Sequence, residues 1–553
     1  MYHQAQEKID FNQINYLIKT HFGIQGKLTP LPGEIDLNFK VDSKDGSKFV
    51  LKISKVFEDL SYLDFQEKLF LHLNSKNTPK LIKGINGNFK TTFQDENGEI
   101  RHIRLLSWIS GRVWSRVNPI TDSLRLSLGR LCGGITKKLK NFTHEYSNRY
   151  FEWDIAQSLW VEDHLSLFDS EEKDLLHSFL ISFKNAQKEY NNLRRGVIHN
   201  DPNDNNIIVT NDLVNPHVHS LIDYGDAINT QIINDVAICC TYAIMDVCDP
   251  LEAALPIIKG YHSKYPLFEQ ELQFLYNLIG MRLIISVTKS AINKVEFPLN
   301  EYLWISQKPA WKLLRKWSKI SNEFANFRFR ETCGFNPHPK YNIFSKWAKK
   351  QTSLLSDLFP SLGKEEVYFL DLSVSSPWVG REEEFNNIDY FQFKIKQLQK
   401  EESKKLISGG YLEPRSLYTS NAYQKIGNDG KEFRCIHLGI DFWIPSKTPV
   451  HALYDGIVVS AVNDKGEKSY GGMIILKHDF KSFVFYTLYG HLALESINNI
   501  QPGKKLKQGD FLAFIGSSTE NGNWATHLHF QIMLSLLDYE NDFPGVCYFK
   551  QIE

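Results

Sequence analysis

The chain has 553 residues, of which 42% are hydrophobic and 13% aromatic, and its 64 basic residues balance its 64 acidic ones. This length is too great for one ordinary core, so we expect two or three domains, and the composition excludes wholesale disorder. A net charge of zero gives no support for bulk nucleic-acid or membrane-surface binding. We therefore expect a multidomain globular protein with no nucleic-acid partner and no membrane partner.

The cysteines and the N-terminus indicate a compartment. The seven cysteines are scattered without a C-x-x-C pair, which argues against both a disulfide framework and a thiolate zinc site. Residues 1–10 lack an apolar signal core, and no run approaches the length of a membrane span. A reducing cytoplasm is the simplest location.

The first third of the chain alternates between strand and helix patterns. Residues 31–41 and 48–53 predict a pair of strands joined by a turn at Asp45-Gly46. Apolar residues at helical spacing then predict a helix over 59–73. The segments that follow predict two further strands and a series of helices, at 89–93, 100–108, 123–144 and 156–190.

Two polar clusters follow short apolar runs in the middle of the chain. The first holds His199 and Asp201 as H-x-D, with Asn206 five residues after the aspartate. The second is Leu221-Ile-Asp-Tyr-Gly-Asp226, which contains Asp223. The apolar runs predict strands, so both clusters lie at strand ends. An isolated H-x-D is more often a polar turn, but two such motifs in this order favour phosphoryl-transfer chemistry.

The residue types fit that chemistry. Asp201 would orient or accept the proton of the attacking hydroxyl. Asn206 and Asp223 would hold Mg²⁺ against the phosphates of ATP, because a hard cation prefers oxygen ligands.

These motifs resemble the aminoglycoside-phosphotransferase superfamily, and more closely its hydroxylysine-kinase-like branch, over about residues 31–350. The resemblance implies a two-lobed, protein-kinase-like α+β fold. It makes Lys52, in Val-Leu-Lys-Ile, the phosphate-contacting lysine, although a lone strand lysine is usually only solvated. Glu67 is the candidate partner of Lys52, and Gly33 belongs to the loop over the nucleotide.

The same resemblance gives supporting roles to three residues. His199 and Asp226 complete the motifs, and an aspartate at the position of Asp235 commonly supports the catalytic loop in this family. The acceptor implied is the hydroxyl of a small amino alcohol or hydroxy-amino acid. A protein kinase is disfavoured, because no A-P-E-like activation segment follows Asp223-Tyr-Gly.

A second site is predicted near the C-terminus. His437 and Asp441 form H-x-x-x-D, and His527 and His529 form H-x-H within an apolar strand, which puts both imidazoles on one face. His491 lies between these motifs. Two imidazoles and a carboxylate with an open position are a catalytic zinc arrangement, in which bound water loses its proton near neutral pH.

This pattern resembles the lysostaphin/LytM-type zinc metallopeptidases, over about residues 411–532. The resemblance implies an antiparallel β fold with His437, Asp441 and His529 as zinc ligands. It gives His491 and His527 roles in polarising the substrate carbonyl or moving protons, with a peptide as substrate. The alternative is a non-catalytic, zinc-bearing binding or regulatory module on a kinase.

We therefore predict a bifunctional enzyme that uses ATP, Mg²⁺ and Zn²⁺. Some bacterial proteins that resemble it in both modules continue into an aminotransferase, which leaves open two alternatives: an aminotransferase partner or third module, and a natural two-module protein.

The domains are expected to divide between the two sites. We place a kinase-like N-lobe at 1–107, a helical C-lobe at 108–355, a breaker-rich linker at 356–405 and the metallopeptidase domain at 406–553. The two sites are expected to act independently, so that a fragment starting near residue 403 would still bind zinc. The alternative is that the linker completes one of the domains.

Overall fold

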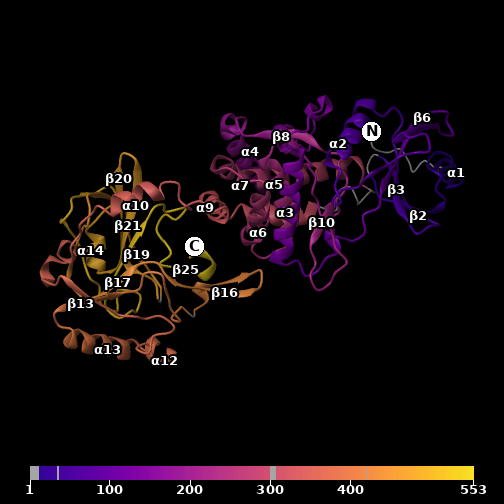
Figure 1. Ribbon diagram of the computed structural model, residues 1–553. Coiled ribbons are helices and arrows are strands. Elements are labelled where there is room, and N and C mark those ends of the chain that lie inside the picture. The colour runs from indigo at the N-terminus through magenta and orange to yellow at the C-terminus, as the bar shows by residue number, and fades with distance from the viewer. Residues whose placement is uncertain (1–10, 34–35, 299–306, 419, 467, 553) are drawn as a thin grey trace. The chain divides into compact units, whose positions relative to one another are not determined.

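The computed structural model describes residues 11–33, 36–298, 307–418, 420–466 and 468–552. The chain divides into two compact units, Met1–Phe335 and Asn336–Glu553 (Figure 1). The boundary thus follows Phe335, whereas the sequence placed it at 355, because the helix that comes next packs on the strands of the second unit. In the part of the chain described, no helix is long and apolar enough to cross a membrane.

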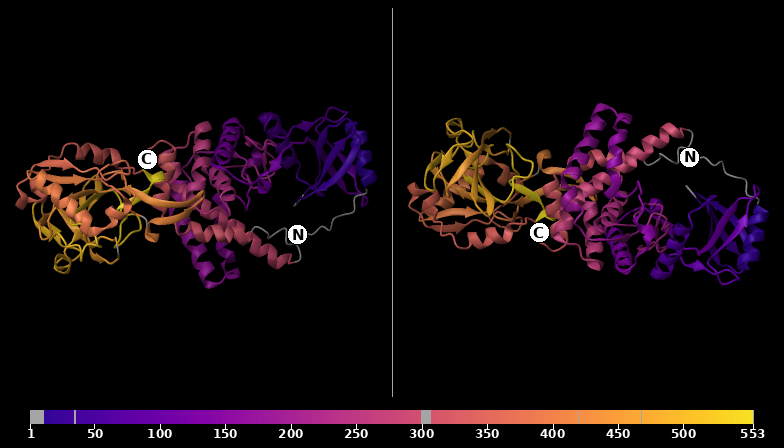
Figure 2. Two further views of the ribbon diagram at one scale, coloured as in Figure 1. Left: turned by 90° about the horizontal axis from the view of Figure 1, so that it is seen from below. Right: turned by 90° about the horizontal axis from the view of Figure 1, so that it is seen from above.

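Unit 1 begins with a helix and an antiparallel sheet, drawn in indigo and violet in Figure 2. The sheet order is β1-β2-β3-β6-β4, with β5 paired on β6. Helix α2 starts after Asp59, whose carboxylate accepts from the amide of Ser61 at 2.8 Å as an N-cap. The elements are α1 (Phe11–Phe22), β1 (Gly26–Leu31), β2 (Leu37–Ser43), β3 (Lys48–Ile53), α2 (Leu60–Leu73), β4 (Leu81–Ile82), β5 (Lys90–Gln94) and β6 (Ile100–Ser107).

The rest of unit 1 is mainly helical, with short strands carrying the polar motifs. Strand β8 pairs with β11, and β9 pairs with both β10 and β7. The helices are α3 (Asp122–Leu139), α4 (Ser170–Tyr190), α5 (Ile233–Ala243), α6 (Pro250–Lys264), α7 (Glu269–Glu296), α8 (Gln307–Trp317) and α9 (Asn322–Thr332), with 3₁₀ turns over Ile155–Leu167. The strands are β7 (Arg112–Val113), β8 (Arg195–Ile198), β9 (Ile207–Val209), β10 (Val218–Leu221) and β11 (Ile228–Gln231).

Helix α7 is the centre of this helical part. Nineteen of its 28 residues are buried, so apolar side chains face its neighbours on nearly every side. Glu271 caps its start by accepting from the amide of Phe268 at 2.8 Å. The helix therefore crosses the core and brings its few polar residues to fixed positions inside the unit.

Unit 2 is built on an eight-stranded sheet of order β12-β13-β17-β24-β21-β20-β19-β22, antiparallel except for the β12–β13 pair. Its strands are β12 (Glu366–Phe369), β13 (Lys405–Gly409), β17 (Ile440–Trp443), β19 (Gly456–Asp464), β20 (Gly471–Phe480), β21 (Phe483–Leu492), β22 (Lys505–Leu506) and β24 (Leu528–Met533). In this register Asp441 lies opposite His529, and Gly490 lies opposite His529 on the other side. The segments that carry Asp441, His529 and His491 are thus neighbours in the sheet.

Smaller strands and helices complete unit 2. Strand β16 pairs with β14, β15 and β25, while β18 pairs with β23. Phe344 and Trp347 of α10 pack their rings on Phe485 at 5.4 and 4.9 Å, which places this helix in unit 2. The elements are α10 (Tyr341–Ala348), α11 (Leu355–Leu358), α12 (Glu382–Asn386), α13 (Ile388–Glu401), β14 (Glu413–Pro414), β15 (Gln424–Gly427), β16 (Gly430–His437), β18 (Pro449–His451), α14 (Leu494–Asn498), β23 (Phe511–Phe514) and β25 (Val546–Tyr548).

The segment 356–405, predicted as a linker, is part of unit 2. Strand β12 extends the large sheet by pairing with β13, and α13 buries Phe391, Ile395 and Leu398 against it. The breaker residues that suggested a linker separate these short elements and do not prevent them from packing.

Candidate functional site

The H-x-D segment follows β8, and His199 ties it to the second motif. His199 Nε2–H donates to the carbonyl of Ile222 at 3.1 Å, and its Nδ1 accepts from the amide of Asp201 at 3.2 Å. Burial lowers the pKa of His199 to about 4, so the imidazole is neutral and can do both. The two motifs therefore meet through one buried imidazole.

Asp201 is held by two amides and a guanidinium. Asn206 and Asn203 donate to its Oδ2 at 2.7 and 2.8 Å, and Arg282 Nη2 donates to its Oδ1 at 3.2 Å. Burial raises the pKa of Asp201 well above its usual range, Asp226 raises it further, and Arg282 opposes the change. A carboxylate with a raised pKa is a better proton acceptor once ionised.

Asp223 comes directly after Ile222, whose carbonyl accepts from His199, and its carboxylate faces Lys52. The Lys52 Nζ lies 3.4 Å from Asp223 Oδ1 and 3.8 Å from Asp36 Oδ2. The Lys52 charge holds the pKa of Asp223 below its usual range, so this side chain stays an anion. With φ of 59°, Asp223 has a left-handed backbone that is uncommon for any residue but glycine. The site thus presents an ionised carboxylate beside a cation, as a metal–phosphate complex requires.

Glu67 is not the partner of Lys52, and this part of the sequence prediction is wrong. Its carboxylate lies 3.5 Å from Lys90 Nζ, whereas Asp36 and Asp223 face Lys52. The inward-facing residue on α2 is its neighbour Gln66, which accepts from Arg104. Because successive helix residues point about 100° apart, Glu67 faces away from this contact.

Gly33 lies in a crowded turn before β2. A Cβ there would lie 2.3 Å from Asn38 Nδ2 and 2.5 Å from the carbonyl oxygen of Asp36. The neighbouring positions 34–35 lie outside the described residues. The turn thus requires glycine for its own packing, and a contact with nucleotide stays a prediction.

Asp235 lies next to the H-x-D segment. Thr136 donates to its Oδ2 at 2.9 Å. Burial raises the pKa of Asp235 to about 6. Asn200, which lies between His199 and Asp201, has φ of 65° and therefore a left-handed backbone. Asp226 is close enough to Asp201 to raise the pKa of that carboxyl.

Arg282 is a site residue that sequence reasoning missed. It is 1% exposed on α7, and it also donates to the carbonyl of Trp153 at 2.7 Å and to the hydroxyl of Tyr242 at 3.2 Å. Its position inside the apolar run Leu-Ile-Gly-Met-Arg-Leu-Ile-Ile was the available signal, because a buried arginine needs a charged partner. That partner is Asp201.

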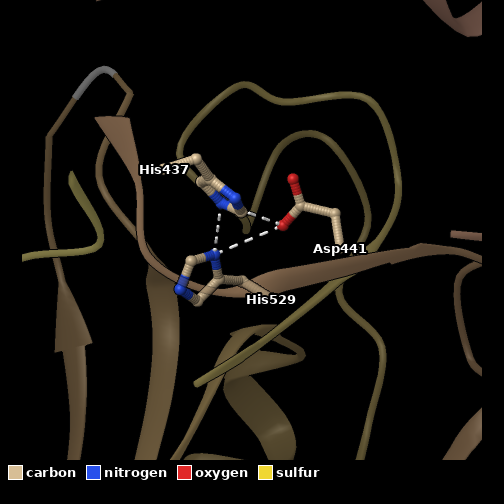
Figure 3. Close-up of side chains that lie close together, drawn as sticks. All are labelled: His437, Asp441 and His529. Carbon is tan, nitrogen blue, oxygen red and sulfur yellow. Dashed lines mark hydrogen bonds and ion pairs between the residues drawn. The ribbon is translucent and has the colours of Figure 1, made fainter. Parts of the chain in front are cut away.

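The H-x-x-x-D and H-x-H motifs converge in unit 2, where the three side chains point toward one another (Figure 3). His437 Nε2 lies 3.0 Å from His529 Nδ1, and each lies 3.3 Å from Asp441 Oδ1. All three residues are buried and present one ligand atom each to a common point. Two imidazole nitrogens and one carboxylate oxygen are a donor set that fits zinc.

Fixed partners orient these ligand atoms. His437 Nδ1–H donates to the carbonyl of Gly410 at 2.8 Å, and His529 Nε2–H donates to Gln531 Oε1 at 3.1 Å. The opposite nitrogen of each ring is thereby left as a lone-pair donor at the cluster. Arg415 Nη1 donates to Asp441 Oδ2 at 2.7 Å. His437 and Arg415 together hold the pKa of Asp441 well below its usual range despite burial.

His491 and His527 lie beside the cluster with their ring centroids 4.2 Å apart. Their Nδ1–H groups donate to the carbonyls of Asn521 and Ala525 at 2.9 and 2.6 Å. Burial lowers the pKa of both imidazoles. His527 Nε2 lies 3.6 Å from Asp441 Oδ1, next to a cavity of about 220 Å³ that both histidines line. The site thus has two neutral imidazoles facing a space large enough for part of a peptide.

Arg415 and Glu413 are the residues of this site that the sequence did not reveal. Arg415 Nε donates to Glu413 Oε2 at 2.6 Å, and both side chains are buried. They precede the H-x-x-x-D motif by more than twenty residues, so only the pairing of β14 with β16 brings them to Asp441. No motif spacing in the sequence marks Arg415 as a partner of Asp441.

Comparisons with known proteins agree with this division. Residues 27–269 match the model of the Phosphotransferase enzyme family, and residues 435–539 match that of Peptidase family M23. The hydroxylysine kinase of Mus musculus is 26% identical over 342 residues, covering 57% of this chain and 91% of that protein. The DD-carboxypeptidase/endopeptidase Mpg of Neisseria meningitidis serogroup B (strain ATCC 13091 / M2091) is 31% identical over 101 residues, covering 18% of this chain and 20% of that protein.

Among solved structures, the amicoumacin kinase hAmiN aligns with a TM-score of 0.44 at 14% identity, covering 61% of this chain and 98% of that one. A microcompartment-associated aminopropanol kinase aligns with a TM-score of 0.40 at 16% identity, covering 60% and 100%. The family matches confirm the predicted fusion of two enzyme modules and the predicted fold classes.

Proposed function

Starting from a phosphotransferase domain joined to a family M23 peptidase domain, we propose that unit 1 transfers the γ-phosphoryl group of ATP to the hydroxyl of a small amino alcohol or hydroxy-amino acid. The observation that carries this is the meeting of Asp201, Asn206, Asp223 and Lys52 in one site. The similarity to hydroxylysine kinases over nearly their full length supports this class of acceptor.

Each of these residues has a task that its surroundings support. Asp201 takes the proton of the acceptor hydroxyl, because Asn203, Asn206 and Arg282 fix its direction. Lys52 binds phosphate oxygens in place of its present carboxylate partners. Asn206 and Asp223 would hold Mg²⁺, which supplies positive charge to the phosphates when bound. Because ATP is the donor, we place the protein in the cytoplasm.

A phosphorylation screen against a metabolite library tests this proposal. We expect ATP-dependent phosphorylation of one or a few hydroxylated amines or amino acids. Asp201→Asn should abolish it, whereas the same chemical change at Asp174, which is exposed on α4, should not. Phosphorylation of a hydroxylated amine at an equal rate by Asp201→Asn would overturn the assignment.

We further propose that unit 2 is a zinc-dependent peptide hydrolase. The supporting observation is that His437, Asp441 and His529 present three ligand atoms 3.0–3.3 Å apart. Zinc, when bound, would supply a Lewis acid and an activated water. His491 and His527, with Nδ1–H groups fixed by carbonyls, would then handle protons or polarise the substrate carbonyl through Nε2.

A non-catalytic zinc module is the competing function, and His491 separates the two. Both functions need the three ligands, but only hydrolysis needs two more imidazoles at the cavity. We expect hydrolysis of glycine-rich or cell-wall peptides by the wild-type protein and none by His491→Ala, with zinc retained in both. Absence of hydrolysis by the wild type would favour the non-catalytic module, whereas equal hydrolysis by the two proteins would contradict the role given to His491.

A further inference from the structure

The segment 366–401 lies outside both segments that match a family, yet it contacts the metal-site region of unit 2 in several places. Strand β12 pairs with β13 in parallel, with Val367 opposite Leu406. Helix α13 contributes to a buried cluster that also contains Trp443, Ala525 and Val546. Those three residues flank the metal-site strands, so the segment packs directly behind the site.

Gln392 makes the most specific of these contacts. Its Oε1 accepts from the amide of Thr526 at 2.8 Å and from the Thr526 hydroxyl at 3.1 Å. Thr526 immediately precedes His527, whose Nδ1–H is bonded to Ala525 on the other side. Gln392 of α13 thus accepts from both hydrogen-bond donors of Thr526, the middle residue of the turn 525–527.

A second side chain of α13 fixes the other face of the same histidine. Gln399 Nε2 donates to the carbonyl of Trp443 at 2.9 Å. The Trp443 ring stacks on His527 with centroids 6.0 Å apart and planes 28° apart. Gln392 therefore fixes the backbone next to His527, and the Trp443 ring packs against the His527 imidazole. Gln399 in turn holds the backbone of Trp443.

The beginning of the segment reaches the opposite side of the cluster. The amide of Leu372 donates to Glu413 Oε1 at 2.7 Å, and Glu413 Oε2 accepts from Arg415, which in turn donates to Asp441. Leu372, Ile388 and Phe391 also line the cavity beside the histidines. Two independent hydrogen-bonded paths thus start in one segment and end at the metal site.

We propose that the segment 366–401 is a working part of the peptidase site, in which Gln392 is a positioning residue that holds the turn 525–527 and so aims His527 into the cavity. This rests on the proposed peptide hydrolysis for its catalytic consequence. The positioning itself requires only the hydrogen bonds described above.

The test compares variants of the full chain that differ in the acceptor at position 392. Gln392→Met keeps the length of the side chain but has no oxygen to accept from Thr526. Gln392→Glu keeps an acceptor for both donors. Lys396→Ala, on the exposed side of the same helix, is the matched control. Zinc content, hydrogen exchange of the peptide covering residues 521–530, and kcat and KM for peptide hydrolysis are measured for each.

We expect Gln392→Met to bind zinc fully, to exchange the amides of the 525–527 turn roughly fivefold faster, and to lose about tenfold in kcat with KM nearly unchanged. Gln392→Glu should restore both slow exchange and kcat, and Lys396→Ala should match the wild type. If Gln392 only stabilised the fold, Gln392→Met would raise amide exchange across the whole of unit 2. It would not lower kcat while leaving KM unchanged.

Two results would overturn the proposal. One is unchanged exchange of residues 521–530 in Gln392→Met, and the other is accelerated exchange that Gln392→Glu does not reverse. If the wild type hydrolyses no peptide, the proposed function fails, but the exchange measurements still decide whether Gln392 positions the turn.

Discussion

The two sites of this protein differ in how many charged groups they bring together. In unit 1, carboxylates gather before any metal is bound, and the cations Lys52 and Arg282 compensate them at 3.4 and 3.2 Å. In unit 2, the cluster contains one carboxylate, which Arg415 compensates at 2.7 Å, and imidazoles whose far nitrogens are fixed by backbone or amide oxygens. A site for a hard cation must bring several oxygen ligands together, many of them anionic, whereas a zinc site can be built mainly from imidazoles.

The difference predicts how each site responds to change. In unit 1 the groups are separable, since Asp201 and Asp223 pair with different cations and are expected to have different tasks. In unit 2 the ligands share contacts at 3.0–3.3 Å, so the site is expected to be kept or lost as a whole.

The largest effect concerns the segment that the sequence called a linker. A fragment starting at Asn336 should fold and bind one zinc, because it contains β12 and α13. A fragment starting at residue 403 should be insoluble or free of metal, because it lacks the apolar residues of α13 that cover Trp443 and Val546. Expression of both fragments with metal analysis checks this. A stable, zinc-binding fragment from residue 403 would restore the linker interpretation.

The next effect is on metal retention. His437→Ala or Asp441→Ala should lose zinc completely, since two remaining ligands hold the metal poorly. His491→Ala should keep it, because His491 contributes no atom to the ligand cluster. Metal content of the purified variants is the measurement, with His451→Ala, on β18 and outside the ligand cluster, as a control. Full zinc in His437→Ala would contradict the ligand assignment.

In unit 1, Asp201→Asn should lower phosphoryl transfer by about 10²–10⁴-fold while leaving ATP binding largely intact. The reason is that Asp201 handles the acceptor proton, whereas Lys52, Asn206 and Asp223 contact the nucleotide complex. Steady-state transfer rates and nucleotide titration separate the two properties. A parallel loss of ATP binding would mean that Asp201 helps to hold the Mg²⁺–nucleotide complex, as is proposed for Asn206 and Asp223.

Arg415 offers a way to sharpen the comparison of charge compensation. Replacing it with Met leaves Asp441 buried without its guanidinium, which costs on the order of 3–5 kcal/mol in the metal-free protein. Bound zinc would provide a substitute positive charge, so the loss should be smaller with zinc than after treatment with a chelator. Thermal unfolding with and without chelator gives the two values. Equal losses would show that Arg415 acts only by packing.

The smallest expected effect is a shift in pH dependence at Arg282. In the proposed function the ionised form of Asp201 is the base, so transfer should rise with pH as this carboxyl loses its proton. Burial and Asp226 raise its pKa, and Arg282 lowers it. Arg282→Met should therefore move the rising limb of kcat/KM to higher pH, whereas Arg282→Lys should move it less. Profiles that superimpose would exclude an electrostatic role for this arginine.

Much of each site could be predicted from sequence, because both motifs combine short spacing with strand geometry. His199, Asp201 and Asn206 lie within eight residues of one another, so local backbone structure alone keeps them together. His527 and His529 are two residues apart at the start of β24, and both imidazoles lie beside Asp441. The presence of two motifs in a fixed order, in each half of the chain, then favoured one type of reaction over an ordinary polar turn.

Only the tertiary structure decided the partners that come from distant segments. Glu67 was assigned to Lys52 by its place on a helix. Adjacent helix residues point in directions about 100° apart, and it is Gln66, not Glu67, that faces inward and accepts from Arg104. Arg282, Arg415 and Gln392 reach their sites by packing of α7, by pairing of β14 with β16, and by docking of α13. The sequence thus determined the chemistry of each site, because that chemistry lies in local spacing, while the supporting charges and hydrogen bonds depend on long-range packing that no spacing encodes.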